Sequence, residues 1–293
     1  MMDQADRLRE LVKKKTEKKN KAISKKTQLP RIITVTSGKG GVGKSNFVVS
    51  LSIYLQRNGN KVLIFDADMG MGNDDVIMGF LPKYNVYDVI FNDKKIEEVV
   101  TETQFGVKLL PAGNDVSKFE EVTHEQRTKF IDKLSILEDV DYIIIDTGAG
   151  INRSVLAFIA CCEELIVVTT PEPTSLTDAY SLLKAVNYFK LKDDIELVVN
   201  RAANEEDGKH TYDKFSSVVR RFLNIKLNYL GNMSDDKKVS QSVRMQQPFL
   251  VKYPYAKVSL DLENIANKIM GHSGNKKGTT VQGLFRKLFN IFS

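Results

Sequence analysis

A glycine-rich loop between an apolar run and a helical pattern constrains this chain most strongly. Residues 32–36 are apolar or β-branched, residues 46–57 follow helical spacing, and the loop at 38–45 reads Gly-Lys-Gly-Gly-Val-Gly-Lys-Ser. This is the spacing G-x-x-x-x-G-K-[ST] of a phosphate-binding loop. A chance glycine-rich turn is the alternative, but it would explain neither flank, whereas phosphate binding requires a strand before the loop and a helix after it.

The residue types of the loop fit phosphate chemistry. Glycines let backbone N–H groups curl around phosphate oxygens, where side chains would block the approach. Lys44 would balance the charge of the β- and γ-phosphates, and the Ser45 hydroxyl would be a ligand of Mg²⁺. The predicted nucleotide-binding residues of this segment are Gly38, Gly40, Gly41, Val42, Gly43, Lys44, Ser45 and Asn46.

The rest of the core predicts one α/β domain around a mostly parallel sheet. Further strands are expected at 61–66, 107–111, 142–146, 165–169, 195–200 and 226–230, each followed by a helical pattern. Runs such as Tyr-Ile-Ile-Ile indicate strands that helices cover on both faces. Alternating strands and helices predict right-handed βαβ units, whose ligands bind beyond the carboxyl ends of the strands.

Two of these strands end in carboxylates. The second strand ends at Asp66, with Asp68 two residues further on, and Asp146 follows four apolar residues in the pattern of a Walker B strand. On their own they could be exposed turn residues. Beside a phosphate loop, however, they would repel the phosphates unless a metal ion lay between, so the pattern predicts Mg²⁺.

The loop resembles the deviant Walker A motif of the MinD/ParA family, a SIMIBI-type group of P-loop NTPases, because Lys39 directly follows the first glycine. The resemblance covers about residues 30–270. It implies ATP/ADP and Mg²⁺ as cofactors, slow ATP hydrolysis, and a homodimer in the ATP state in which Lys39 reaches the partner's nucleotide. The alternative is a solvent-facing loop lysine.

The same resemblance assigns roles to the carboxylates and to two strand ends. Asp68 would orient or deprotonate the attacking water, while Ser45, Asp66 and Asp146 would hold Mg²⁺, the two carboxylates through its waters. The backbone N–H of Gly148 would sense the γ-phosphate at a position where many relatives have proline. The chain has no Asn-Lys-x-Asp guanine motif. Finally, Asn200 and Arg201 match the family's adenine-contact segment, and this favours ATP over GTP.

Charge divides the chain into three segments. Residues 1–29 carry a net charge of +6 and 272–293 carry +4, so the 30–271 ATPase core carries −4. Basic tails favour acidic partners or serve only as solubilising ends. A slightly acidic core argues against the DNA-binding branch of the family, so nucleic acid is not the expected partner. The adjacent Cys161 and Cys162 offer neither a disulfide framework nor metal-ligand spacing.

The first tail is similar to the D-Q-A-x-x-L-R start of the FlhG branch of the family (also called FleN or YlxH), which sets flagellar number and placement. The resemblance implies that a short helix stimulates FlhF, an SRP-type GTPase, and that basal-body components are further partners. The alternative is a disordered start. The predicted partner-binding residues are Asp3, Gln4, Ala5, Leu8 and Arg9.

The last tail predicts a flexible linker followed by an amphipathic membrane-targeting helix. Arg286 and Lys287 lie on its polar face, where they would meet anionic headgroups. The protein is therefore expected in the cytoplasm, and at the inner face of the cell membrane when ATP is bound. Packing of the helix on the protein's own core is the alternative, and the two arrangements could belong to different nucleotide states. The predicted membrane residues are Val281, Leu284, Phe285, Leu288, Phe289 and Phe292.

Two functional classes therefore remain. The first is an ATP-switched, membrane-associated regulator of flagellar assembly. The second is a ParA-type DNA-partitioning ATPase that uses its basic tails on nucleic acid. The apolar stripe of the last tail separates the two, because DNA binding does not require it.

Overall fold

The computed structural model describes residues 29–68, 73–113, 116–119, 121–137, 139–271 and 279–292. Within them an eight-stranded sheet has the order β3-β4-β2-β5-β1-β6-β7-β8. The strands are β1 (Arg31–Ser37), β2 (Val62–Ala67), β3 (Thr101–Glu102), β4 (Lys108–Pro111), β5 (Tyr142–Ala149), β6 (Glu164–Thr169), β7 (Asp194–Ala202) and β8 (Lys226–Ser234).

The parallel sheet predicted from the sequence is confirmed, with one addition. β1 lies at its centre and pairs in parallel with β5 and β6. The two-residue β3 pairs antiparallel with β4 at one edge, and no sequence signal predicted it. A strand this short has no periodicity of its own, so only its partner defines it.

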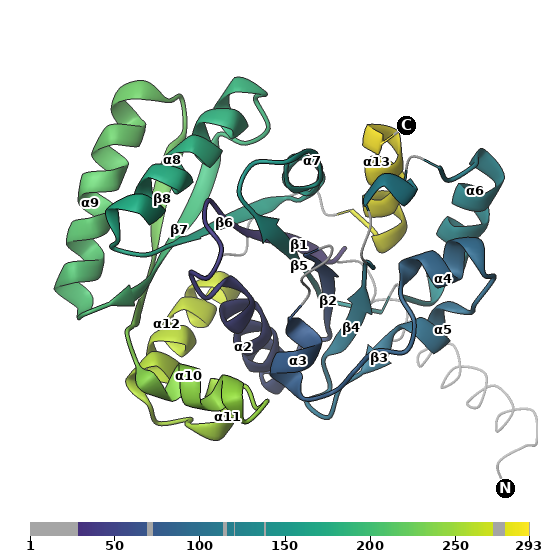
Figure 1. Ribbon diagram of the computed structural model, residues 1–293, viewed down its shortest axis with the longest axis horizontal. Coiled ribbons are helices and arrows are strands. Elements are labelled where there is room, and N and C mark those ends of the chain that lie inside the picture. The colour runs from purple at the N-terminus through teal and green to yellow at the C-terminus, as the bar shows by residue number, and fades with distance from the viewer. Residues whose placement is uncertain are drawn as a thin grey trace, which may run out of the picture.

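Helices cover both faces of the sheet (Figure 1). One face carries α2 (Lys44–Arg57), α3 (Asp74–Met78), α10 (Lys237–Arg244), α11 (Phe249–Lys252) and α12 (Lys257–Gly271). On the other lie α7 (Arg153–Cys161), α8 (Pro173–Tyr188), α9 (Glu205–Phe222) and α13 (Val281–Phe292), and beyond them α4 (Val86–Phe91) and α6 (His124–Lys133). Shorter elements are α5 (Ile96–Val99) and the 3₁₀ turns η1 (Val116–Phe119) and η2 (Leu134–Leu137).

Alternating strand residues build two hydrophobic cores. On β1, Ile32 joins the core under α7 and α13, while Ile33 joins the core under α2 and α12. Ile143 and Ile144 on β5 divide in the same way. This explains why the strands are almost entirely apolar, since each face of a helix-covered parallel sheet needs its own apolar side chains.

In this structure α13 packs on the protein's own core, which is the alternative arrangement to the detached helix. All six apolar residues of its predicted stripe are buried in the core on the α7 face of the sheet. The Phe285 ring lies 5.2 Å from that of Phe65 on β2 and 5.1 Å from that of Phe130 on α6. The expected separate segment 272–293 thus contributes a core helix here. Aromatic pairing of this kind stabilises the contact beyond the area it buries.

Candidate nucleotide-binding site

The predicted loop forms the turn between β1 and α2 at the carboxyl edge of the sheet. Gly38 packs so closely on α8 that a Cβ would overlap the backbone of Asp178. Gly43 has φ +92°, in the left-handed region, and a Cβ there would overlap the side-chain nitrogen of Asn200. Both glycines are therefore required by the local packing as well as by phosphate access.

Asn200 and Arg201 hold this loop from β7, which lies two strands from β1 in the sheet. Asn200 Nδ2 donates to the carbonyl of Val42 at 2.7 Å, and Arg201 Nη2 donates to the carbonyl of Gly41 at 2.9 Å. Arg201 itself has φ +56°, a strained conformation for a long side chain. The two residues predicted to contact adenine thus lie next to the loop and brace it.

Lys44 lies buried among carboxylates. Its Nζ donates to Asp146 Oδ1 at 2.6 Å and lies 3.7 Å from Asp68 Oδ2. Burial would lower the pKa of the Lys44 ammonium, but Asp146 and then Asp68 outweigh it, so that its pKa is raised. Lys44 is therefore held in its charged form, and a bound phosphate would compete with Asp146 for its ammonium group.

The carboxylates around Lys44 crowd one another. Burial, together with the charge of Asp146, raises the pKa of Asp66 to about 7. Burial also raises the pKa of Asp68, although Lys44 opposes this. Asp74, at the start of α3, joins the cluster, and burial and the charges of Asp146 and Asp66 raise its pKa well above the ordinary value. The site thus holds four carboxyl groups around one buried ammonium.

The strand ends also couple the loop to the residues after β5. The backbone N–H of Gly150 donates to the Ser37 carbonyl at 2.8 Å, and Thr147 Oγ1 donates to the Val35 carbonyl at 3.2 Å. At Gly148 a Cβ would lie 3.2 Å from Asp68 Oδ1, so a larger residue would crowd that carboxylate. The predicted phosphate sensor and the predicted water-orienting residue are thus neighbours.

The described residues contain no ready cage of three or more His, Cys, Asp or Glu ligands. That fits a Mg²⁺ ion, which keeps several waters and takes oxygen ligands from the nucleotide. Ser45 lies in the first turn of α2, and Asp66 and Asp146 lie side by side in the β2–β5 register. The donor set therefore suits Mg²⁺ held through the Ser45 hydroxyl and through waters.

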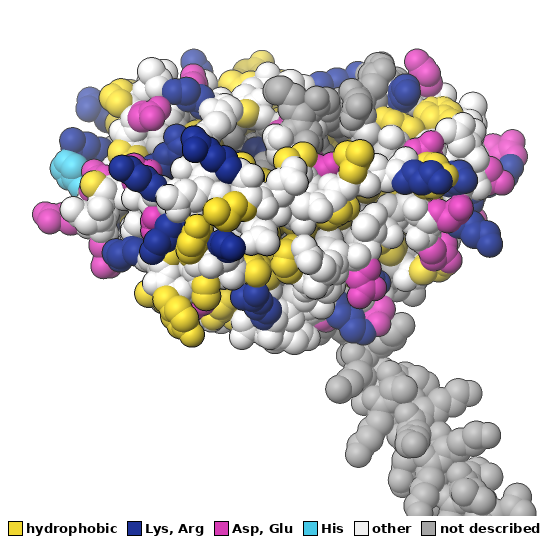
Figure 2. Space-filling model, turned by 60° about the horizontal axis from the view of Figure 1, so that its bottom comes forward, with side chains coloured by type: hydrophobic (Ala, Val, Ile, Leu, Met, Phe, Trp, Pro, Cys, Tyr) yellow, Lys and Arg dark blue, Asp and Glu magenta, His cyan; other side chains and the backbone are white. Residues whose placement is uncertain are grey.

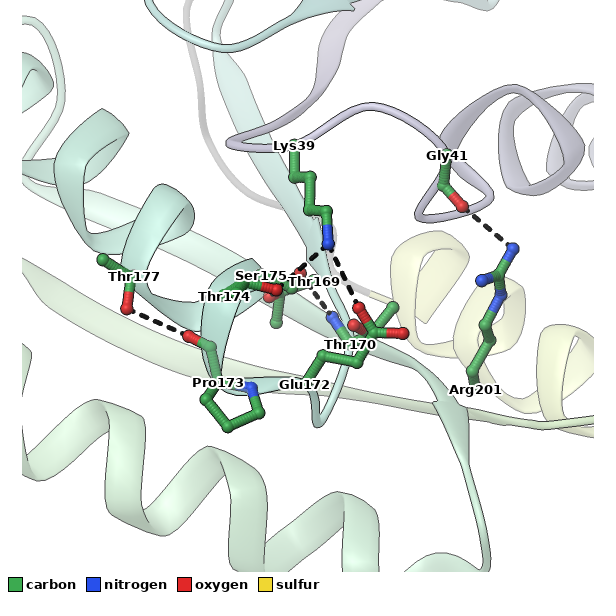
Figure 3. A network of polar contacts seen from close by, with 10 residues as sticks. All are labelled: Lys39, Gly41, Thr169, Thr170, Glu172, Pro173, Thr174, Ser175, Thr177 and Arg201. Atoms are coloured by element: carbon green, nitrogen blue, oxygen red, sulfur yellow. Dashed lines mark hydrogen bonds and ion pairs between the residues drawn. The ribbon is translucent and has the colours of Figure 1, made fainter.

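Lys39 points toward the start of α8 (Figure 3). Its Nζ donates to Glu172 Oε2 at 3.2 Å and to Thr174 Oγ1 at 3.0 Å, both at the start of α8. The Lys39 side chain is 39% exposed and that of Glu172 is 56% exposed. An exposed pair of this kind is weak and readily exchanged.

The structure also locates residues that the sequence reasoning missed. Glu172 and Thr174 flank Pro173 at the start of α8, after the strand end of β6. Proline at the first helical position and the preceding strand end were visible in the sequence and could have placed them near the loop. For Asp74, the sequence offers only Asn73 before it and an apolar run after it. This pattern indicates the start of a helix, but it does not indicate that the carboxylate is buried.

At the chain ends, the predictions have different outcomes. Residues Asp3, Gln4, Ala5, Leu8 and Arg9 lie outside the described residues. The predicted membrane residues Val281, Leu284, Phe285, Leu288, Phe289 and Phe292 are all buried on the core, while Arg286 and Lys287 are exposed. No helix among the described residues is long and apolar enough to cross a membrane.

Comparison with known proteins places the chain in a family. A family profile described as an AAA domain matches residues 30–199. The chain is 34% identical to the antiactivator FleN of Pseudomonas aeruginosa over 82% of its own length and 86% of that protein. It is 33% identical to the flagellum site-determining protein YlxH of Helicobacter pylori, over 92% and 91% of the two chains. The chain belongs to the FleN/YlxH (FlhG) group of MinD/ParA-type ATPases.

The fold of this FleN/YlxH-type ATPase agrees with that assignment. The septum site-determining protein MinD of Pyrococcus horikoshii, solved with Mg-ADP, superimposes with a TM-score of 0.66 at 26% identity. The match covers 84% of this chain and 98% of that one. The predicted family and fold are therefore confirmed, and the chain is an ATPase of this group.

Proposed function

We propose that this protein is an ATP-switched, dimerising regulator of flagellar number and placement that associates reversibly with the membrane through α13. Its cofactors would be ATP or ADP and Mg²⁺, bound by the loop at 38–45 together with Asp66, Asp68 and Asp146. The FleN and YlxH relatives support the flagellar assignment. The observation that carries the membrane and switch parts is that the amphipathic helix α13 docks on Phe65 of β2 and on α7, both next to the switch residues.

Dimerisation is supported by the way Lys39 is held. One nucleotide needs only Lys44, and Lys39 is held apart from that site by two exposed contacts at the start of α8. Exchange of Glu172 for the phosphates of a second nucleotide would replace a weak surface pair by a stronger charge-assisted contact. ATP would then bridge two subunits, and hydrolysis would release them.

While α13 is docked on the core, its apolar side chains are hidden from the membrane. Its six apolar side chains are at most 2% exposed. Moving them into water would cost on the order of 10 kcal/mol, at roughly 1.5–3 kcal/mol for each side chain. The helix would therefore leave the core only for another apolar surface, and acyl chains provide one. Its exposed Arg286 and Lys287 would meet anionic headgroups, at about 1 kcal/mol per contact.

Two contacts would link the nucleotide to this helix. Phe65, which pairs with Phe285, directly precedes Asp66 on β2. Arg153, the first residue of α7 after the Gly148 loop, donates to the Ile291 carbonyl at 3.2 Å and lies over the Phe292 ring at 5.5 Å. A shift of either strand end on ATP binding would reach α13 directly. Two released helices on one dimer would then bind together, which raises membrane affinity.

The proposed partner of the first tail is the SRP-type GTPase FlhF, which residues 3–9 would stimulate. A helix this short needs a partner surface to form. Gln4 would orient water in that partner, as glutamine does in other GTPases. A peptide of residues 1–23 should raise FlhF GTP hydrolysis, and absence of stimulation by both peptide and intact protein would reject this part.

Vesicle sedimentation tests the membrane proposal. The protein should pellet with anionic vesicles in ATP and stay in solution in ADP. Arg286→Glu combined with Lys287→Glu should abolish pelleting and leave ATP binding intact, because both side chains are exposed on α13. Arg220→Glu combined with Arg221→Glu, two exposed residues on α9, is the matched control for net charge and should still pellet.

A second candidate, non-specific nucleic-acid binding, is favoured by one surface. Lys237, Lys238, Arg244 and Lys252 are exposed on α10 and α11. Figure 2 brings that side of the molecule forward, and basic and hydrophobic side chains lie next to one another there. Tyr255 on this side is 91% exposed. Sedimentation with plasmid DNA, in place of vesicles, separates the two functions.

A further inference from the structure

Asp74 is the most deeply buried carboxylate near the nucleotide loop and lies outside the predicted site. Its side chain is 0% exposed, and it is the first residue of α3, just after the switch carboxylate Asp68 and the segment that follows it. No N–H or O–H group among the described residues donates to either of its carboxylate oxygens. Such a group is costly to bury and calls for a partner.

Among the described residues, the group in contact with Asp74 is another carboxyl group and not an N–H donor. Its carboxyl group faces that of Asp146 and feels the charge of Asp66, both predicted to hold the waters of Mg²⁺. Two carboxyl groups can form a hydrogen bond only if one is protonated. The nearest cation, Lys44, already donates to Asp146 at 2.6 Å. Four carboxyl groups therefore surround one buried ammonium, those of Asp66, Asp68, Asp74 and Asp146.

Support of the helix start does not explain Asp74 either. Within the part of the chain that the structure describes, Asn73 at the cap position makes no side-chain cap hydrogen bond, and neither oxygen of Asp74 accepts a backbone N–H there. Asp75 is the residue whose carboxylate turns back to the backbone, accepting from Val76 at 2.7 Å. Asp74 instead points into the cluster that surrounds Lys44.

We propose that Asp74 is a positioning residue of the metal site, whose carboxylate accepts a hydrogen bond from a water bound to the Mg²⁺ that accompanies the nucleotide. The inference rests on the proposed nucleotide site. When phosphates draw Lys44 away from Asp146, the cluster loses its ammonium, and a hydrated divalent cation restores the charge balance. The waters of the ion also bring the O–H donors that Asp74 lacks. Outer-shell carboxylates of this kind orient a metal without touching it.

Manganese titration tests this role. Mn²⁺ replaces Mg²⁺ and is followed by electron paramagnetic resonance while it binds the complex of the full-length protein with ADP. Asp74→Asn should weaken Mn²⁺ binding by roughly tenfold. The matched control Asp75→Asn, one residue away on the same helix, should stay within about twofold of the parent protein.

Two further measurements separate a metal role from a structural one. ADP affinity in EDTA should be unchanged in Asp74→Asn, and the thermal midpoint of the nucleotide-free protein should not fall, because the neutral amide can donate to Asp146 as the protonated carboxyl group does. Asp74→Ser, smaller and also neutral, repeats the test if the asparagine variant does not fold. Loss of folding in both variants, or equal loss of ADP affinity with and without metal, would assign Asp74 a structural role and overturn the proposal.

The remaining outcomes are also decisive. Mn²⁺ affinities of Asp74→Asn and Asp74→Ser within about twofold of the parent would reject the role of Asp74 alone and leave the nucleotide site standing. A parent protein that binds ADP but shows no ADP-dependent Mn²⁺ binding would reject the metal site, and this inference with it. Tenfold weaker Mn²⁺ binding with unchanged ADP binding in EDTA is the result that supports it.

Discussion

Two lysines five residues apart on one loop have opposite surroundings. Lys44 is 7% exposed and pairs with a buried carboxylate, whereas Lys39 is 39% exposed and pairs with the exposed Glu172. Removing one partner from a buried pair is costly, but exposed pairs contribute little. The difference indicates that Lys44 is fixed for a nucleotide in its own subunit. Lys39 is held loosely, in contacts that it can exchange.

The comparison of Lys44 with Lys39 predicts its largest effect in the stability of the folded protein. Lys44→Ala should lower the free energy of unfolding by about 3–5 kcal/mol, because it leaves Asp146 buried without its ammonium partner. It should also abolish nucleotide binding. Lys39→Ala should change stability by less than about 1 kcal/mol and retain binding. Chemical denaturation with nucleotide titration measures both, and equal losses in the two variants would contradict the contrast.

The second prediction concerns hydrolysis. Asp68→Ala should still bind ATP but hydrolyse it at least about 100-fold more slowly, since Asp68 is the expected base or water-orienting group. A protein of this kind should accumulate as the ATP dimer. Phosphate release and light scattering follow the two properties. Hydrolysis at the parent rate would remove Asp68 from the reaction.

The third prediction is a pH dependence of stability that arises beside Lys44, at Asp66. The pKa of Asp66 is raised to about 7 in the folded protein, from 3.8 ordinarily. A raised pKa means that the folded state binds the extra proton. The stabilisation of the folded state by this proton is therefore full below about pH 4, and it is lost as the pH rises through about 7.

The test compares the nucleotide-free protein with Asp66→Asn. The stability difference between them should fall with rising pH by at most about 1.4 kcal/mol per pH unit. Urea denaturation at several pH values across this window gives the slope. Parallel curves for the two proteins would contradict the buried environment of Asp66.

The smallest expected effect is at Glu172. Glu172→Gln should weaken the hold on Lys39 and favour the ATP dimer, lowering the ATP concentration for half dimerisation by up to about fivefold. Light scattering against ATP concentration measures it, and Glu206→Gln, an exposed carboxylate on α9, is the control. A higher ATP requirement in Glu172→Gln would show that Glu172 does not restrain Lys39.

Local sequence was enough to predict the loop, because its glycines, lysines and flanking elements are adjacent in the chain. The seven main strands were equally predictable, since their apolar runs are continuous. The contacts of Lys39 were not, because Glu172 lies 133 residues away and only the sheet brings it near. The burial of Asp74 likewise depends on how α3 packs, and one aspartate at a helix start looks like any other.

The C-terminal helix shows a different limit of prediction. Its stripe at Val281, Leu284 and Phe285 predicted an amphipathic helix. The structure forms that helix as α13 (Val281–Phe292), with the apolar stripe buried. The same stripe suits acyl chains or a protein core equally well, because the hydrophobic effect is not directional. Only Phe65, Phe119 and Phe130, which are scattered along the chain, show which surface is covered in this state.

Vesicle sedimentation of Asp68→Ala, with and without Lys39→Ala, tests the central claim most directly, namely that an ATP dimer releases α13 to the membrane. We predict that Asp68→Ala pellets with anionic vesicles in ATP but not in ADP, and that adding Lys39→Ala abolishes pelleting while ATP binding persists. Equal pelleting in ADP, or by the double variant in ATP, would contradict the account.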